Sequence, residues 1–317
     1  MIQLLRFTLF FWRTYLVRTL LTKRMLLVAL GCMVPPLMAW FVLTVPRHGP
    51  LPVQAFMYPS LFLVLQIMVP LAAVIGGAAV ISEEIDDRTI TYLLTRPIPR
   101  PSILLGRWLA TLTILFAFVG TSVFTLGTIA EFKSSHPTVH PPVVERPDEG
   151  SQLDAHDERP ADERARARAE ARRQRRERER DEPAAVLVEA MPDHRLPSGL
   201  FAAVLTVALL GTAVYSALFA VFGTFLKHPM IAGLGYAFAI EGFLANLPGA
   251  SQSWTVQYYL RSYLLSNHPA LWNALHEETL AKYGTANEAV TKLAIVLAVT
   301  LLAGSLTIRR KQYELSA

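Results

Sequence analysis

The sequence has one cysteine among its 317 residues and lacks the short motifs of several enzyme classes. Because Cys32 stands alone, no intrachain disulfide and no cysteine-based metal site can form. The chain has no GxxxxGK(S/T) phosphate-binding loop, so it cannot hydrolyse ATP by itself. It also has no HExxH zinc motif and no GxSxG nucleophile elbow. These absences predict a protein that is not an enzyme and has no catalytic, metal-binding or cofactor-binding residues of its own.

Long hydrophobic runs are what the sequence has instead. Hydrophobic residues make up 52% of the chain, and the mean hydropathy is +0.35. We expect an all-α, polytopic membrane protein, because each run is long enough to cross a hydrocarbon core of about 30 Å as a helix. Gly76 and Gly77, inside the second run, favour close packing of helices. The six expected transmembrane helices are 25–45, 56–81, 102–130, 199–226, 229–247 and 289–308.

Basic residues in the short connections predict the orientation. Thirteen Lys and Arg residues fall on the side of the two termini and only four on the opposite side, so both termini are expected in the cytoplasm. The first 24 residues carry five of these charges spread among apolar residues. They are typical of an amphipathic interfacial helix with Arg6, Arg13 and Arg24 near one face. The alternative is that they are the early part of the first span.

Residues 131–197 form a highly charged insertion between the third and fourth spans. They contain 13 basic and 16 acidic residues, interleaved in the stretch ADERARARAEARRQRRERERDE. Interleaved charges with almost no apolar face indicate a solvated helix between proline-rich connectors, and they cancel most of the field that nucleic acid would need. We therefore divide the chain into 1–130, the extracytoplasmic insertion 131–197, and 198–317.

The polar stretch ISEEIDDRTITYLLTRPIPRPSILLGRWLA, at 81–110, lies between the second and third spans. Ser82 is a candidate N-cap, and the four acids that follow it suit the first turns of a helix. The prolines of RPIPRP end this helix, so we expect a short cytoplasmic helix over 82–95. It is too short and too charged to cross a bilayer, and it can transmit force from a soluble partner to two spans.

This stretch resembles the cytoplasmic motif of ABC-2-type permeases, the membrane subunits of many ATP-binding-cassette exporters. The residues that fit the motif are Glu84, Arg88, Leu93, Leu94, Pro97, Arg100 and Gly106. Arg107 replaces the usual lysine, and Thr89–Ile90 stands where glycine–threonine is common. The resemblance implies six spans per subunit, a dimer of membrane subunits and a coupling helix that docks on an ATPase, which binds the ATP and Mg. It makes Glu84 and Arg88 the preferred contacts, within a coupling set of Glu83, Glu84, Asp87, Arg88, Tyr92, Pro97 and Arg100.

Two further features indicate a pathway or gate on the outer side. Glu241 lies inside the fifth expected span, where an ionisable residue is a functional candidate by default; it could line the pathway or pair with Arg261. Its alternative role is purely structural. The outer loop 248–288 carries Trp254 and Tyr258 beside Arg261, which suits either short helices that close the pathway or an interfacial belt without a gating role.

Taken together, the sequence predicts the permease subunit of an ABC exporter in the cytoplasmic (inner) membrane of a bacterium. Its expected partners are a separate nucleotide-binding ATPase, a second permease subunit in a homo- or heterodimer, and the lipid bilayer, with no nucleic acid. The alternative is a non-transporting membrane anchor or assembly factor that uses the charged extracytoplasmic arm as a scaffold.

Overall fold

The structure is a computed structural model of the chain, and it describes residues 2–44, 56, 59–86, 99–135, 199–246, 250–267 and 284–310. The chain divides into two units, Met1–Ser135 with Arg195–Ala317 and His136–His194, and every described residue belongs to the first. The regular elements within the described ranges are all helical, which confirms the expected all-α fold class. Beyond Ser135, the predicted insertion lies outside the described residues.

The helices follow the hydrophobic runs of the sequence. Four of the elements are not α-helical: η1 and η4 are wider π-helices, and η5 and η6 are tighter 3-10 helices. In chain order the elements are α1 (Ile2–Leu20), α2 (Lys23–Cys32), α3 (Val34–Thr44), η1 (Pro59–Met68), α5 (Val69–Asp86), α7 (Arg100–Ser135), α10 (Leu200–Phe225), α11 (Pro229–Gly235), η4 (Tyr236–Phe243), η5 (Leu244–Asn246), η6 (Ala250–Trp254), α12 (Val256–Asn267) and α14 (Ala286–Arg310).

Five helical stretches among the described residues are long and apolar enough to cross a membrane. They are Lys23–Val42, Pro59–Ser82, Arg100–Phe132, Leu200–Phe225 and Ala286–Arg309. Each coincides with an expected span to within a few residues, so a polytopic membrane protein is confirmed. The remaining expected span, 229–247, is a shorter apolar helix, Pro229–Phe243, which η5 continues.

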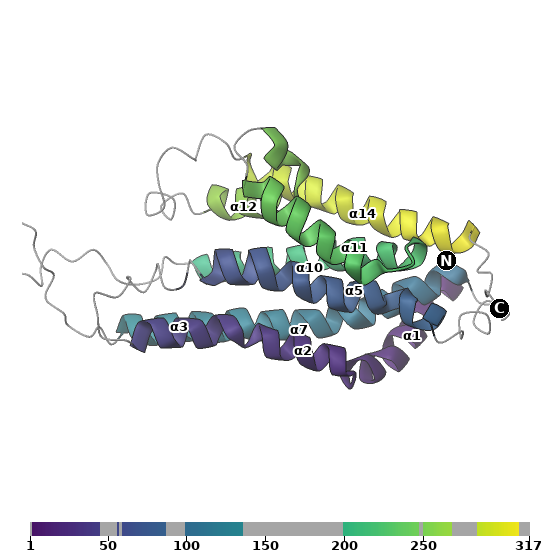
Figure 1. Cartoon of the computed structure of the whole chain (residues 1–317), viewed down its shortest axis with the longest axis horizontal. Helices are drawn as coiled ribbons and strands as arrows, with labels where there is room; N and C mark the ends of the chain where they lie inside the picture. The colour runs from purple at the N-terminus through teal and green to yellow at the C-terminus, as the bar shows by residue number, and fades with distance from the viewer. Residues whose placement is uncertain are drawn as a thin grey trace, which may run out of the picture. The chain divides into compact units, whose positions relative to one another are not determined.

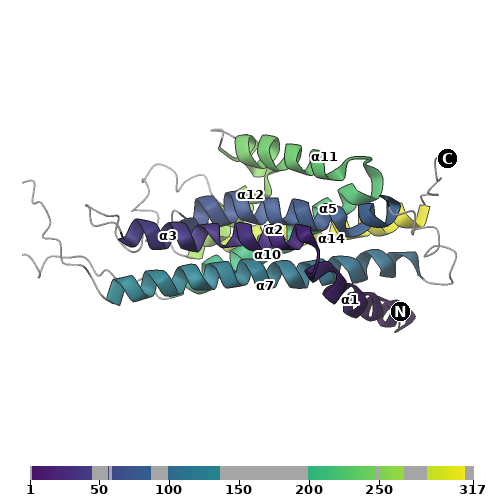
Figure 2. The same ribbon diagram turned by 60° about the horizontal axis from the view of Figure 1, so that its bottom comes forward.

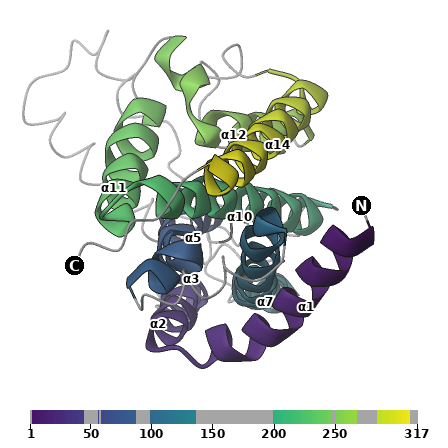
Figure 3. The ribbon, with the colours of Figure 1, turned by 90° about the vertical axis from the view of Figure 1, so that its right-hand side faces the viewer.

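Helix α10 is the centre of the bundle, and α5, α7, α11, α12 and α14 all pack against it (Figures 1 and 3). Glycines allow α5 and α10 to approach closely: a Cβ on Gly77 would lie 2.8 Å from the Ser216 oxygen, and one on Gly223 would lie 2.7 Å from the Ala78 oxygen. The expectation that the glycine pair in the second span permits close packing is therefore confirmed. Figure 2 shows α2 and α3 following one another along the length of α5.

Helix α1 lies across the end of α7 rather than along it, and it leads towards α2 (Figure 3). It packs on α7 through an aromatic cluster that includes Phe11 and Tyr15. This placement suits an interfacial helix, but α1 ends at Leu20 and a new helix begins at Lys23. The expectation that Arg24 shares one face with Arg6 and Arg13 is therefore wrong, because Arg24 belongs to the helix after the break.

The close contact between α1 and α7 depends on Gly106. A Cβ there would lie 2.5 Å from the Phe11 Cβ and 2.7 Å from the Thr8 oxygen. We expect Gly106→Ala to lower the stability of the detergent-solubilised protein by about 1–3 kcal/mol, because α1 must move away. Gly120→Ala on the same helix is the control, since nothing lies within 4 Å of an added Cβ there. Equal melting temperatures for the two variants would contradict this account of the contact.

The second span continues without a break into the polar stretch that follows it. Helix α5 runs to Asp86, and Ser82 lies in its interior, where its Oγ donates to the Ala78 oxygen at 2.8 Å. The predicted N-cap at Ser82 is therefore wrong: the hydroxyl bonds backward to the preceding turn, and the helix carries on. Residues 82–86 of the predicted coupling helix extend α5, and 87–95 lie outside the described residues.

Candidate functional site

A cluster of buried and half-buried polar side chains lies near one end of the bundle, where η1, η4, α10 and α12 meet. We call it the polar cluster, and its members are Gln66, Tyr215, Tyr236, Glu241, Gln257 and Arg261. The end of the bundle that contains it, opposite the two termini in Figure 1, is called the far end. Glu241, Gln257 and Tyr215 are fully buried.

The Glu241 carboxylate is the acceptor at the centre of the cluster. Its Oε1 accepts hydrogen bonds from the Tyr236 hydroxyl and from the Val256 backbone N–H, both at 3.0 Å. Its Oε2 accepts the Gln257 backbone N–H at 3.0 Å. These two N–H groups belong to the first turn of α12, which has no intrahelical acceptor for them and carries the positive end of the helix dipole. Glu241 therefore caps α12 from a different element.

Local helix geometry brings these groups together. In a π-helix the hydrogen bonds join residues five apart, so Tyr236 and Glu241 can meet on one side of η4. The Thr255 hydroxyl accepts the Tyr258 N–H at 3.2 Å, which satisfies a third orphan donor of α12. The fully buried Tyr215 side chain, from α10, lies near the side chains of Glu241 and Gln257.

Gln257 ties α12 to the start of the second span. Its Nε2 donates to the Leu65 backbone oxygen at 2.5 Å. Leu65 lies in the π-helix η1, and the residue five positions later is Pro70, which has no N–H to donate. The Leu65 carbonyl therefore lacks its donor in that pattern, and the buried amide of Gln257 supplies one.

Arg261 makes a second tie between the same two elements. Its Nη2 donates to Gln66 Oε1 at 2.6 Å, so adjacent residues of η1 hold two residues of α12. Of the predicted gate residues, Glu241 and Arg261 thus meet in one cluster, although the donors to Glu241 described above are Tyr236 and the α12 backbone. Trp254 is 82% exposed and lies apart from this hydrogen-bonded network.

Tyr258, the remaining gate candidate, borders the cluster. Its ring packs edge-on against Tyr259, with centroids 5.2 Å apart. Both rings line a small pocket with Glu288 at the start of α14. The side of α12 that lines this pocket is distinct from the buried side that carries Gln257.

Sequence reasoning missed four members of the cluster: Gln66, Tyr215, Tyr236 and Gln257. Gln66 could have been noticed as a lone amide in the hydrophobic second run, followed four residues later by a proline. Tyr215 and Tyr236 carry no such signal, because an isolated tyrosine is common in spans and at their ends. Gln257 gave none either, since its partner is a backbone carbonyl distant in sequence.

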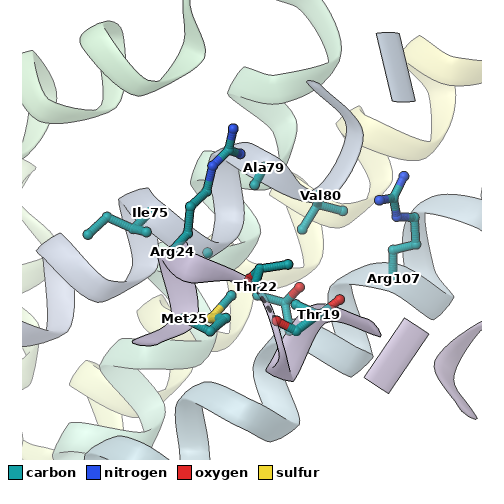
Figure 4. Close-up of a pocket in the computed structure, with 10 residues that line it drawn as sticks. Thr19, Thr22, Arg24, Met25, Ile75, Ala79, Val80 and Arg107 are labelled. Carbon is teal, nitrogen blue, oxygen red and sulfur yellow. Dashed lines mark hydrogen bonds between the residues drawn. The ribbon is translucent and has the colours of Figure 1, made fainter. Parts of the chain in front are cut away.

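The opposite end of the bundle carries a second group of polar residues, which we call the basic pocket (Figure 4). It lies between the α1–α2 junction, α5 and the start of α7. Figure 4 shows the guanidinium groups of Arg24 and Arg107 extending in the same direction, beside Ala79 and Val80. Arg107 is 6% exposed, and its guanidinium lies over the Tyr15 ring, 4.3 Å from the centroid. This end, where α1 begins and α14 ends, is called the basic end.

Three of the predicted coupling residues are described, and they lie at the basic end. Glu83 and Glu84 are in the last turn of α5, whereas Asp87, Arg88, Tyr92 and Pro97 lie outside the described residues. Arg100, at the start of α7, donates through Nη1 to the Arg309 backbone oxygen at 3.3 Å. It thereby caps the last turn of α14, where carbonyls have no helical donor.

Comparison with known protein families finds a match over part of the chain. The family model described as "ABC-2 family transporter protein" covers residues 21–140, which include the polar stretch and the spans on both sides of it. The match supports the resemblance seen in the sequence: over these residues, which are less than half of the chain, the protein is similar to ABC-2 family transporter proteins. No curated protein matches the chain.

Proposed function

We propose that the chain is the permease subunit of an ABC exporter and that a separate ATPase subunit drives it. The family match over residues 21–140 carries this proposal, because it includes the stretch that resembles a coupling motif. Substrate would cross the cytoplasmic membrane of a bacterium, between this subunit and a second permease subunit. ATP and Mg would be bound by the ATPase.

The arrangement of the basic end supports a coupling role for the segment between α5 and α7. Its first end is the continuous helix of the second span, which reaches Asp86. Its other end begins α7, where Arg100 is bonded to α14 and Gly106 is in close contact with α1. A force applied to this segment would therefore act on α5, α7, α14 and α1 together.

The proposed orientation places the basic end in the cytoplasm and the far end outside. The described ionisable side chains around the basic pocket are all basic, which agrees with the bias of the short connections. In this orientation the polar cluster closes the outer end of the bundle. Glu241, Tyr258 and Arg261 then belong to an outer gate, and Trp254 is an exposed side chain beside it.

Purification of the tagged permease in a mild detergent tests the proposal. We expect an ATPase subunit with a GxxxxGK(S/T) loop to copurify. If the chain is a membrane anchor or assembly factor, an extracytoplasmic partner bound to residues 131–197 should copurify without any ATPase. A preparation with neither partner, from cells in which the permease is stable, would contradict the proposal.

Proteolysis of intact spheroplasts tests the orientation. We expect added trypsin to cut between residues 145 and 190, because that arginine-rich stretch follows the third span from a cytoplasmic start. The basic residues near the termini should be protected until the inner membrane is permeabilised. Cleavage of the arginine-rich stretch only after permeabilisation would reverse the proposed orientation.

A further inference from the structure

The polar cluster lies at one end of a continuous helical rod, and the rod's other end, Asp86, is where the chain enters the segment between α5 and α7, called the coupling segment. Leu65 and Gln66, which bind α12, are in η1, and η1 leads without interruption into α5 and on to Asp86. From Leu65 to Asp86 the rod is about 30 Å long, which is the thickness of a hydrocarbon core. Figure 1 shows the second span running along the bundle between its two ends.

At the far end of this rod, the backbone of η1 could form α-helical hydrogen bonds in place of its π-helical ones. A π-helix as long as η1, Pro59–Met68, is unusual, because π-helical geometry normally occurs as single turns. In an α-helical register the Leu65 carbonyl would accept the Val69 N–H, and it would no longer need Gln257. The same change would turn Gln66 about the helix axis and away from Arg261, because the two helices wind residues differently.

We propose that Gln257 and Gln66 are positioning residues of the transport cycle, which latch α12 to the π-helical start of the second span. A shift of α5 that begins at the coupling segment converts η1 towards the α-helical register. The conversion breaks both latch bonds and frees α12 to open the outer end. The role of the shift in transport rests on the proposed function, whereas the latch itself does not.

The latch is tested by labelling a buried cysteine on α12. In a Cys32→Ala, Val256→Cys background, residue 256 should react slowly with a membrane-impermeant maleimide, since Val256 is 6% exposed. We expect Gln257→Leu to raise the labelling rate about 10-fold, the factor associated with the loss of one buried hydrogen bond. Asn267→Leu is the matched control: it also removes an amide from α12, but an exposed one bonded only to the preceding turn. It should leave the rate unchanged.

Pro70→Ala tests whether the missing N–H of Pro70 is the reason that the Leu65 carbonyl binds Gln257, and it leaves the residues of α12 unchanged. It supplies an N–H that competes for the Leu65 carbonyl. It should therefore accelerate labelling in the same direction as Gln257→Leu, and the double variant should label no faster than the faster single one. Gln66→Leu, at a half-buried position, provides a second break in the latch should Gln257→Leu fail to fold. Slow labelling in folded Gln257→Leu or Gln66→Leu, or additive effects of Pro70→Ala and Gln257→Leu, would overturn the proposal.

Repeating the labelling with ATP distinguishes a failure of this proposal from a failure of the proposed function. With the ATPase bound, ATP should accelerate labelling in the background protein and add less than about two-fold in Gln257→Leu, where the latch is already open. If ATP changes no rate while Gln257→Leu still labels faster, the latch stands and the ATP-driven function fails. If ATP accelerates both proteins equally, the latch is not part of the cycle and the inference fails while the function stands.

Discussion

Permease carrying Arg88→Glu is expected to insert and fold normally but to bind its ATPase about 100-fold more weakly. Arg88 fits the motif of ABC-2-type permeases, and this resemblance makes it a proposed contact with the ATPase. Reversing a charge at such an interface leaves the partner's charge facing a like charge, which costs several kcal/mol. The same change in the free permease costs little, because solvated ion pairs contribute on the order of 0.5 kcal/mol. The measurement is the amount of ATPase that copurifies per permease, compared over a dilution series.

Arg18→Glu is the control for this experiment. Arg18 is exposed in the last turn of α1, at the same basic end of the bundle, so the net charge changes equally. It should retain the ATPase. Equal retention by both variants would remove Arg88 from the contact, and equal loss from both would indicate a diffuse electrostatic attraction rather than a docked segment.

Replacement of Glu241 by alanine is expected to have the largest effect on the fold of the far end. The change leaves the Val256 and Gln257 N–H groups and the Tyr236 hydroxyl without their common acceptor. Buried donors that lose their acceptor cost about 1–3 kcal/mol each, so we expect a loss of about 3 kcal/mol or more. The N-terminal turn of α12 should lose its protection against hydrogen exchange, and transport should fall at least ten-fold.

Two other variants bracket this effect. Glu241→Gln keeps one acceptor oxygen but points an amide N–H₂ at a donor, so we expect lower transport with near-normal expression. Glu288→Gln, at an exposed carboxylate of α14, should change neither exchange nor transport. Unchanged exchange at residues 256 and 257 in Glu241→Ala would show that another group caps α12, and it would remove Glu241 from the gate.

The spans could be predicted from the sequence because hydropathy and length alone determine whether a helix can cross a bilayer. Where local signals compete, the prediction was less accurate. Serine is a residue type favoured at helix N-caps, yet the Ser82 hydroxyl donates to the Ala78 backbone oxygen and the second span continues past it. Basic residues spread among apolar ones over the first 24 residues predict a single helix that includes Arg24, whereas in the structure α1 ends at Leu20 and α2 begins at Lys23.

The polar cluster could be predicted only in part, because its bonds join elements that are distant in the chain. Glu241 stood out as a carboxylate in an apolar run, and Arg261 as a basic residue in a loop poor in them. The partners of Glu241 are mainly backbone N–H groups, which every residue carries and no sequence pattern marks. Gln257 reaches a carbonyl that is free only because η1 is π-helical, and that winding depends on tertiary packing.

The most direct test of the coupling account is photo-cross-linking from position 92 in intact membranes. A photoreactive phenylalanine analogue in place of Tyr92 should form a product with an ATP-binding subunit. The same analogue in place of Trp254, which is 82% exposed at the far end, should not form it. Added nucleotide should change the yield at position 92, because the proposed function requires the segment between α5 and α7 to move with the ATPase. Cross-links from position 92 to lipid alone, or an ATPase product of equal yield from position 254, would contradict the account.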